Sequence, residues 1–86
     1  MGNRRANIQI IGDILRLKDA GKTEIMYSVN MSYNQLEKYL DFLLEGGFLR
    51  KVNGKRIPVY QTTPKGRKLL LKIDKLVALL EWEEEY

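Results

Sequence analysis

The strongest structural signal in the sequence is the start of a helix at Ser32. Gln35 follows three residues later, the spacing of a capping box, in which two side chains satisfy free backbone N–H groups at a helix start. Met31 and Leu36 flank the box and are placed to contact each other as a hydrophobic staple. Together these features predict a helix over residues 32–45, with a buried face formed by Leu36, Leu40 and Leu43.

Two shorter helices are predicted before this one. Apolar residues recur every three or four positions from residue 5 to about residue 17, as in an amphipathic helix, and Ala20-Gly21 is expected to end it. Residues 23–29 are expected to form a two-turn helix capped by Thr23. Asn30 follows, and asparagine tolerates the left-handed conformation that often ends a helix.

A β-hairpin is predicted after the third helix. Residues 48–52 and 57–62 are rich in β-branched and aromatic side chains, which favour strands. Asn53-Gly54 lies between them and favours a tight turn with positive φ angles. Pro58 has no N–H to donate, so its strand is expected to carry it near an edge.

A final helix is predicted from Thr63-Pro64 towards the C-terminus, because a capping residue here precedes a proline at the first helical position. Gly66 inside this helix costs about 1 kcal/mol relative to alanine, which favours a close approach of another segment at that point. The apolar stripe of the helix is wider than a small domain needs and consists of Leu69, Ile73, Leu76, Val77 and Leu80, with Leu70 and Leu79 beside it.

The charges of the final helix are polarised. Lysine and arginine gather near its start and glutamates over residues 81–85, an order that opposes the helix macrodipole. Antiparallel pairing of two copies places each acidic end beside the basic start of the partner. We therefore expect an antiparallel homodimer through this helix. The alternative is a monomer whose last helix packs on its own core.

Composition excludes several classes of function. The chain has no cysteine and no histidine, which removes disulfides, the usual zinc ligands, thiol nucleophiles and the commonest general base. We expect no enzyme, no metal site and no cofactor. No apolar run approaches the roughly 20 residues that cross a bilayer, so a cytoplasmic protein without membrane contact is expected. The net charge of +4 permits nucleic-acid binding.

The predicted order is helix, helix, helix, hairpin, helix, which is a mainly α fold with one β-hairpin. Two helices joined by a short turn, the second capped and followed by a two-stranded hairpin, form the layout of a winged helix-turn-helix. We expect residues 1–63 to form this DNA-binding unit. Residues 64–86 are expected to form the dimerisation element within the same structural domain.

In this layout the N-terminal residues of helix 32–45 enter the major groove of DNA. The candidate base-reading residues are Tyr33, Asn34, Gln35, Glu37 and Lys38. Amide side chains pair with adenine, lysine donates to guanine or phosphate, and glutamate accepts from a cytosine amino group. The alternative is an ordinary solvated helix face. Tyr27, Tyr39 and Tyr60 are expected to pack in the core rather than to stack on bases.

The hairpin at residues 50–58 concentrates positive charge, and no acidic residue occurs between Arg50 and Asp74. A purely structural hairpin would more often mix charges of both signs, so we expect this one to contact DNA phosphates. Each phosphate contact releases condensed counterions and adds affinity without reading sequence. The candidate backbone-contact residues are Arg50, Lys51, Lys55 and Arg56, with Arg4, Arg5, Lys22 and Thr23 as further candidates. Alternatively, Arg4 and Arg5 near the N-terminus are exposed to solvent and contact no DNA.

Two segments carry a family resemblance: KTEIMYSVNMSYNQLEKYLDFLLEGGFL at residues 22–49 and VYQTTPKGRKLL at residues 59–70. Over about residues 8–80 the chain resembles the small archaeal winged-helix proteins. These include the ten-kilodalton chromatin-associated DNA-binding proteins of thermoacidophilic archaea and regulators of their viruses. The resemblance implies a dimer joined by a long antiparallel C-terminal helix. Glu37 and the acidic run 81–85 depart from the most basic members of the family.

Three functions are weighed on these grounds. The leading hypothesis is a dimeric, sequence-specific transcriptional regulator that binds double-stranded DNA. Such a protein is expected in the cytoplasm at the nucleoid, and in the host cell if the chain is viral. The first alternative is an architectural protein that coats DNA without sequence preference. The second alternative is a protein-interaction module that uses the basic hairpin to meet an acidic protein surface.

Overall fold

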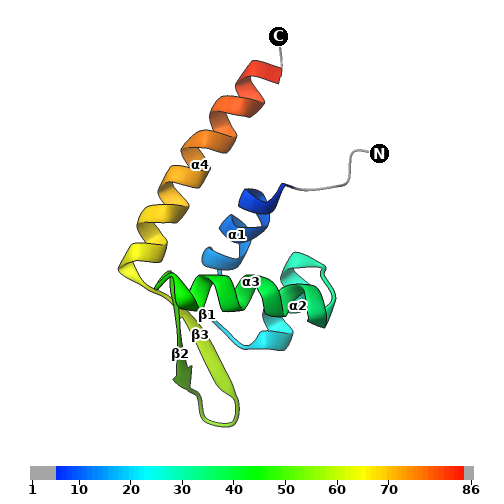
Figure 1. Ribbon diagram of the computed structural model, residues 1–86, viewed down its shortest axis with the longest axis vertical. Helices are drawn as coiled ribbons and strands as arrows, with labels where there is room; N and C mark the ends of the chain where they lie inside the picture. The colour runs from blue at the N-terminus through cyan, green and yellow to red at the C-terminus, as the bar shows by residue number, and fades with distance from the viewer. Residues whose placement is uncertain (1–5, 85–86) are drawn as a thin grey trace.

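The computed structural model describes residues 6–84 of the chain, and its side chains as far as Leu80. Its elements are, in order, α1 (Asn7–Leu15), β1 (Asp19–Ala20), α2 (Lys22–Val29), α3 (Tyr33–Glu45), β2 (Leu49–Asn53), β3 (Pro58–Thr62) and α4 (Pro64–Glu84). The loop between β2 and β3 and the C-terminal end of α4 lie at opposite ends of the molecule (Figure 1), whose longest extent is 49 Å. The predicted mainly α fold with a β-hairpin is confirmed.

The start of α3 is the capping box that the sequence predicts. The Ser32 hydroxyl accepts a hydrogen bond from the Gln35 backbone N–H at 3.2 Å, and the Gln35 side-chain oxygen accepts one from the Ser32 N–H at 3.4 Å. Asn30 ends α2 with a φ of 54°, in the left-handed region, as predicted. However, α2 begins at Lys22 with Gly21 as its N-cap, so the predicted cap at Thr23 is wrong.

Sequence periodicity does not predict the short strand β1. Helix α1 ends at Leu15, before the expected residue 17, and Lys18 takes a φ of 36° as the chain turns. Strand β1 then pairs antiparallel with Tyr60 and Gln61 of β3. The predicted two-stranded hairpin is therefore part of a three-stranded sheet with the order β1-β3-β2.

The wing is the hairpin of β2 and β3 with its connecting loop. The strands pair antiparallel as far as Asn53 opposite Pro58, and the loop spans residues 54–57. The predicted positive-φ turn at Asn53-Gly54 is wrong, because neither residue has a positive φ. Gly54 is needed for space instead: a Cβ at this position would lie 2.3 Å from the carbonyl oxygen of Ile57.

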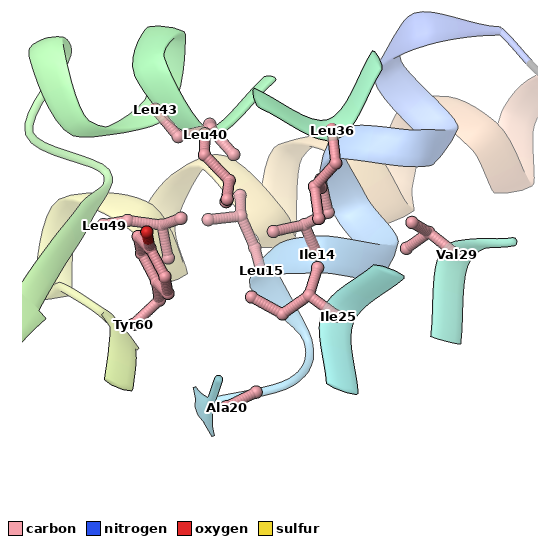
Figure 2. Packing of buried hydrophobic residues seen from close by; sticks show 10 residues of the cluster. All are labelled: Ile14, Leu15, Ala20, Ile25, Val29, Leu36, Leu40, Leu43, Leu49 and Tyr60. Carbon is pink, nitrogen blue, oxygen red and sulfur yellow. The ribbon is translucent and has the colours of Figure 1, made fainter. Parts of the chain in front are cut away.

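The hydrophobic core joins the first three helices to the base of the wing (Figure 2). Leu36, Leu40 and Leu43 of α3 are buried, as predicted, and they face α1 and α2 across this core. Leu49 and Tyr60 anchor the two wing strands to the same core. The buried cluster is Ile14, Leu15, Ala20, Ile25, Val29, Leu36, Leu40, Leu43, Leu49 and Tyr60. Because Leu49 and Tyr60 lie in the same cluster as the α3 leucines, the wing and α3 have a fixed relative position.

Helix α4 begins with the predicted cap. The Thr63 hydroxyl accepts a hydrogen bond from the Gly66 N–H at 3.1 Å. A Cβ on Gly66 would lie 2.2 Å from the Phe48 carbonyl oxygen, so the predicted close packing at this glycine is confirmed. Although α4 is 21 residues long, none of the helices between residues 6 and 84 combines the length and apolar character that a bilayer span requires.

The middle of α4 packs against α1. Ile73 is only 6% exposed, and its Cγ2 would lie 3.2 Å from a Cβ added to Gly12 of α1. Beside this contact, the two guanidinium nitrogens of Arg16 donate to the two carboxylate oxygens of Asp74, each at 3.1 Å. The packing of Ile73 on Gly12 and the bidentate pair of Arg16 with Asp74 together fix the direction of α4 relative to α1.

Candidate nucleic-acid interface

The first turns of α3 present polar side chains to solvent beyond the core. Tyr33, Asn34, Gln35 and Lys38 are exposed and Glu37 is half-buried. The capping box positions this group, because it fixes where the helix begins. It also occupies the Gln35 side-chain oxygen, which accepts the bond from Ser32. The side chains of Asn34 and Lys38, by contrast, take no part in the capping box.

Two of these side chains meet the first residue of α2. The Lys22 ammonium donates to a Glu37 carboxylate oxygen at 2.5 Å and to the Tyr33 hydroxyl oxygen at 3.1 Å. It also lies 4.7 Å from the centre of the Tyr33 ring. Lys22 first, and Tyr33 second, hold the pKa of the Glu37 carboxyl below its ordinary value. The same bond to Glu37 raises the pKa of Lys22, so both groups are charged at neutral pH.

The cations of the wing are in two different situations. Arg50 donates to the side-chain oxygen of Gln61 at 3.0 Å, and the Lys51 ammonium lies 5.9 Å from the centre of the Tyr60 ring. Lys55 and Arg56 are exposed at the loop and make no hydrogen bond or ion pair to any residue within 6–84. The tip of the wing thus carries charge that no side chain described between residues 6 and 80 neutralises.

A cavity of about 240 Å³ lies where α2 and the wing approach each other. It is lined by Lys22, Thr23, Lys51, Ile57, Pro58 and Tyr60. The fold therefore brings two candidate backbone-contact residues at the start of α2 next to one on β2, although they are far apart in the sequence. Arg4 and Arg5, the remaining candidates of this kind, lie outside the described residues.

Two side chains near these elements, Tyr27 and Ile57, are exposed although the sequence predicts otherwise. Tyr27 is 77% exposed, so its prediction as a core residue is wrong; Tyr60 is buried and Tyr39 is half-buried, as predicted. Ile57 was expected in a strand but belongs to the wing loop, where it is exposed. The sequence does contain a signal for this position: proline is favoured as the first residue of a strand, and β3 begins at Pro58, directly after Ile57.

The predicted dimer residues divide along α4. Leu69 is half-buried against the core and Ile73 is buried against α1, so these two residues pack on their own chain. Val77 is half-buried and lines a pocket with Gln9 and Asp13 of α1. Leu76 and Leu80 are 45% and 48% exposed, and their neighbour Leu79 is 56% exposed. The side chains of the acidic run 81–85 lie outside the described residues.

Comparisons with known proteins agree with this geometry. A model of winged helix-turn-helix proteins matches residues 4–81. The uncharacterized protein MJ0290 of Methanocaldococcus jannaschii is 39% identical over 80 residues. That match covers 90% of this chain, and this chain spans about a third of the relative, 36% of its length.

Two solved structures from Sulfolobus solfataricus are similar in fold. Sso10a-2, a DNA-binding protein, has a TM-score of 0.86 at 29% identity, covering 94% of this chain and 87% of its own. The transcriptional regulator BldR has a TM-score of 0.82 at 21% identity, covering 88% of this chain and 59% of its own, and shares the fold alone. The match over residues 4–81 establishes that this chain belongs to the winged helix-turn-helix family.

Proposed function

We propose that this protein is a dimeric, sequence-specific DNA-binding regulator. The observation that carries the proposal is the exposed polar start of α3 beside a wing whose tip holds two cations, Lys55 and Arg56, unpaired within residues 6–84. In this arrangement α3 enters the major groove and the wing follows the phosphates or the minor groove. The likeness to the DNA-binding protein Sso10a-2 supports the same interpretation.

The proposal divides the roles among two sets of residues. Base edges are read by Tyr33, Asn34, Gln35, Glu37 and Lys38, and the backbone is contacted by Thr23, Arg50, Lys51, Lys55 and Arg56, with Lys22, Arg4 and Arg5 as further candidates. Base contacts give discrimination, and phosphate contacts give affinity that falls with salt. The two sets therefore make separable predictions.

The proposed dimer is antiparallel and uses the second half of α4. That half of α4 lies at the end of the molecule away from the wing (Figure 1). Within it Leu76, Leu79 and Leu80 are exposed, and their three- and four-residue spacing places them on one face of the helix. Such a face favours association, because each leucine contributes about 1.5 to 3 kcal/mol when it is fully buried. The opposed charges of the helix ends set the antiparallel direction.

The test is a set of binding titrations over a range of salt, with a selected duplex and a scrambled one. Replacing Lys55 and Arg56 together by glutamate should weaken binding to both duplexes alike, because it removes and reverses charge at the wing. Asn34→Ala should reduce the preference for the selected duplex more than the overall affinity. Equal affinity of the unaltered protein for the two duplexes at every salt concentration would contradict sequence specificity.

An architectural role without sequence preference is the second candidate. It is favoured by one observation: the exposed charge of Lys55 and Arg56 lies on the wing, which can contact phosphates of any sequence. Footprinting separates the two candidates, since discrete protected sites support the regulator and continuous protection supports the coating protein. Unchanged DNA mobility with excess protein at low salt would instead favour a protein-interaction module.

Either DNA-binding role predicts that the protein is located in the cytoplasm, at the nucleoid.

A further inference from the structure

Lys22 joins α2 to the reading face of α3. It is the first residue of α2, and its ammonium contacts both Glu37 and Tyr33, fifteen and eleven positions further along the chain. The Lys22 side chain is 27% exposed and that of Glu37 is 36% exposed, so both lie partly sheltered in the angle between the helices. This arrangement involves two of the five candidate base-reading residues.

The surroundings of Lys22 differ from those of the wing cations. A lysine ammonium has three hydrogen-bond donors, and Lys22 directs two of them to its own chain. Its charge is also placed 4.7 Å from the Tyr33 ring centre. One N–H donor of the ammonium therefore remains for an outside acceptor, and moving the ammonium out of reach of Glu37 would leave that carboxylate unpaired near the DNA. Lys55 and Arg56 face no such loss within residues 6–84.

We propose that Lys22 is a positioning residue, which holds Glu37 as a fixed acceptor for the amino group of a cytosine at one base pair of each half-site. This inference rests on the proposed function. It changes the role of Lys22 from a phosphate contact to a determinant of specificity. The ligand it implies is the cytosine edge in the major groove, which presents an amino donor.

The chemistry of a held glutamate favours cytosine over guanine. Lys22 occupies one Glu37 oxygen, Oε2, and an ionised carboxylate has a second oxygen that only accepts. Guanine presents the acceptors O6 and N7 in the major groove, so it repels this oxygen, whereas the cytosine N4 amino group donates to it.

Lys22 also limits the repulsion between Glu37 and DNA. A lone carboxylate on the reading face is repelled by phosphates and has rotamers that point away from the duplex. The ammonium compensates this charge and restrains the side chain at the same time. The Glu37 carboxylate is ionised at neutral pH, and the bond from Lys22 lowers its pKa further, so it acts there as an acceptor only.

The test compares Lys22→Met with Lys55→Met in the full chain. Methionine keeps an unbranched stem and removes the ammonium in both variants, but only Lys22→Met also removes the contacts of the ammonium to Glu37 and Tyr33. Affinities are measured for the selected duplex and for duplexes with each base substituted at every half-site position, over a range of salt. Thermal unfolding of each variant accompanies the titrations.

Lys22→Met should reduce the preference for cytosine at one half-site position by about tenfold, because the glutamate loses its restraint. Its plot of log affinity against log salt should keep the slope of the unaltered protein. Lys55→Met should leave every base preference intact and reduce that slope by about 0.9 for each phosphate that the wing no longer neutralises. Glu37→Gln should move the preference at the same position towards adenine, since an amide both donates and accepts.

The inference is overturned if Lys22→Met behaves like Lys55→Met, with a reduced salt slope and unchanged preferences; the proposed function then stands. It is equally overturned if Glu37→Gln retains the full cytosine preference, a result that decides the matter even if Lys22→Met does not fold. Absence of any base preference in the unaltered protein would remove the sequence-specific function itself, and with it this inference. These results are distinguishable because the last appears without any substitution.

Discussion

The two halves of α4 have the same apolar spacing but different surroundings. In the first half, Gly66 lies against the backbone of Phe48 and Ile73 is buried against α1. In the second half, Leu76 and Leu80 are nearly half exposed. Spacing thus identifies the residues on one face of a helix, whereas the extent of the neighbouring helix decides how many of them are buried in the core.

The lengths of the two helices account for this division. Helix α4 has 21 residues and α1 has 9, which at 1.5 Å per residue are about 31 and 14 Å long. The stripe therefore continues past the end of its partner. Substitutions of the packed residues Gly66 and Ile73 in the first half should therefore destabilise the fold, whereas substitutions of Leu76 and Leu80 in the second half should change its assembly.

The largest effect on stability is expected from Gly66→Ala. The added Cβ would lie 2.2 Å from a backbone oxygen, which cannot move without displacing β2. We expect a loss of about 3 kcal/mol, despite the gain of about 1 kcal/mol in helix propensity. Chemical denaturation measures it, with Lys68→Ala on the exposed face of α4 as the matched control. Stability equal to that of the unaltered protein would contradict the close approach.

Ile73→Ala should have the next largest effect. Removal of a buried isoleucine side chain typically costs 2 to 5 kcal/mol, and we expect about 2.5 kcal/mol here because the site lies at the margin of the core. Leu71→Ala on the same helix is the control, since Leu71 is exposed and should cost less than about 0.5 kcal/mol. Equal losses in the two variants would remove the distinction between the core face and the open face.

Replacing Leu76 and Leu80 together by glutamine should weaken the proposed dimer while the fold persists. Each leucine removed from a buried interface takes apolar surface out of it, so the dissociation constant should rise at least about tenfold. Sedimentation equilibrium measures this rise, and circular dichroism verifies that the helices remain. A double variant that self-associates as tightly as the unaltered chain would show that this face is not the interface.

The smallest effect is expected from the ion pair at the junction of the two halves. The hydrogen bonds from Arg16 lower the pKa of Asp74, so the folded state binds its proton more weakly than the unfolded state does. The resulting stabilisation is present above the ordinary pKa of aspartate, about 3.9, and is lost as the pH falls through the lower folded value.

Asp74→Asn isolates this contribution. The difference in unfolding free energy between the unaltered protein and the variant should be small, because the pair is exposed, and should shrink as the pH falls from about 6 to below the folded pKa. Parallel denaturation curves over this range measure it. A difference that stays constant with pH would show that the charge of Asp74 contributes nothing.

Much of the fold could be predicted because its signals are local. The capping box at Ser32 and the Thr63 cap with its nearby glycine each depend on residues within one helical turn. Strand β1 could not be predicted, because two residues carry no periodicity and their strand exists only through pairing with β3. The loop of the wing was misassigned for a related reason: Asn-Gly favours a tight turn, but here Gly54 provides space for a neighbouring carbonyl.

The candidate site shows the same division between local and distant information. The polar face of α3 and the positive charge of the wing follow from the order of residues in each segment. The pairing of Lys22 with Glu37 does not, because fifteen positions separate them and only the turn between α2 and α3 brings them together. Sequence patterns thus identified the groups that face DNA in our proposal, but not which of those groups already bind each other.

Selection of bound duplexes from a random pool by the unaltered 86-residue chain tests directly whether the protein reads sequence as a dimer. A sequence-specific dimer should enrich a motif with two-fold symmetry, because each protomer places one α3 in the major groove, with half-sites roughly 34 Å apart if the helices are spaced by one turn of DNA. Retention of DNA without any enriched motif would contradict sequence-specific reading. Enrichment of a single, unpaired half-site would contradict the dimer.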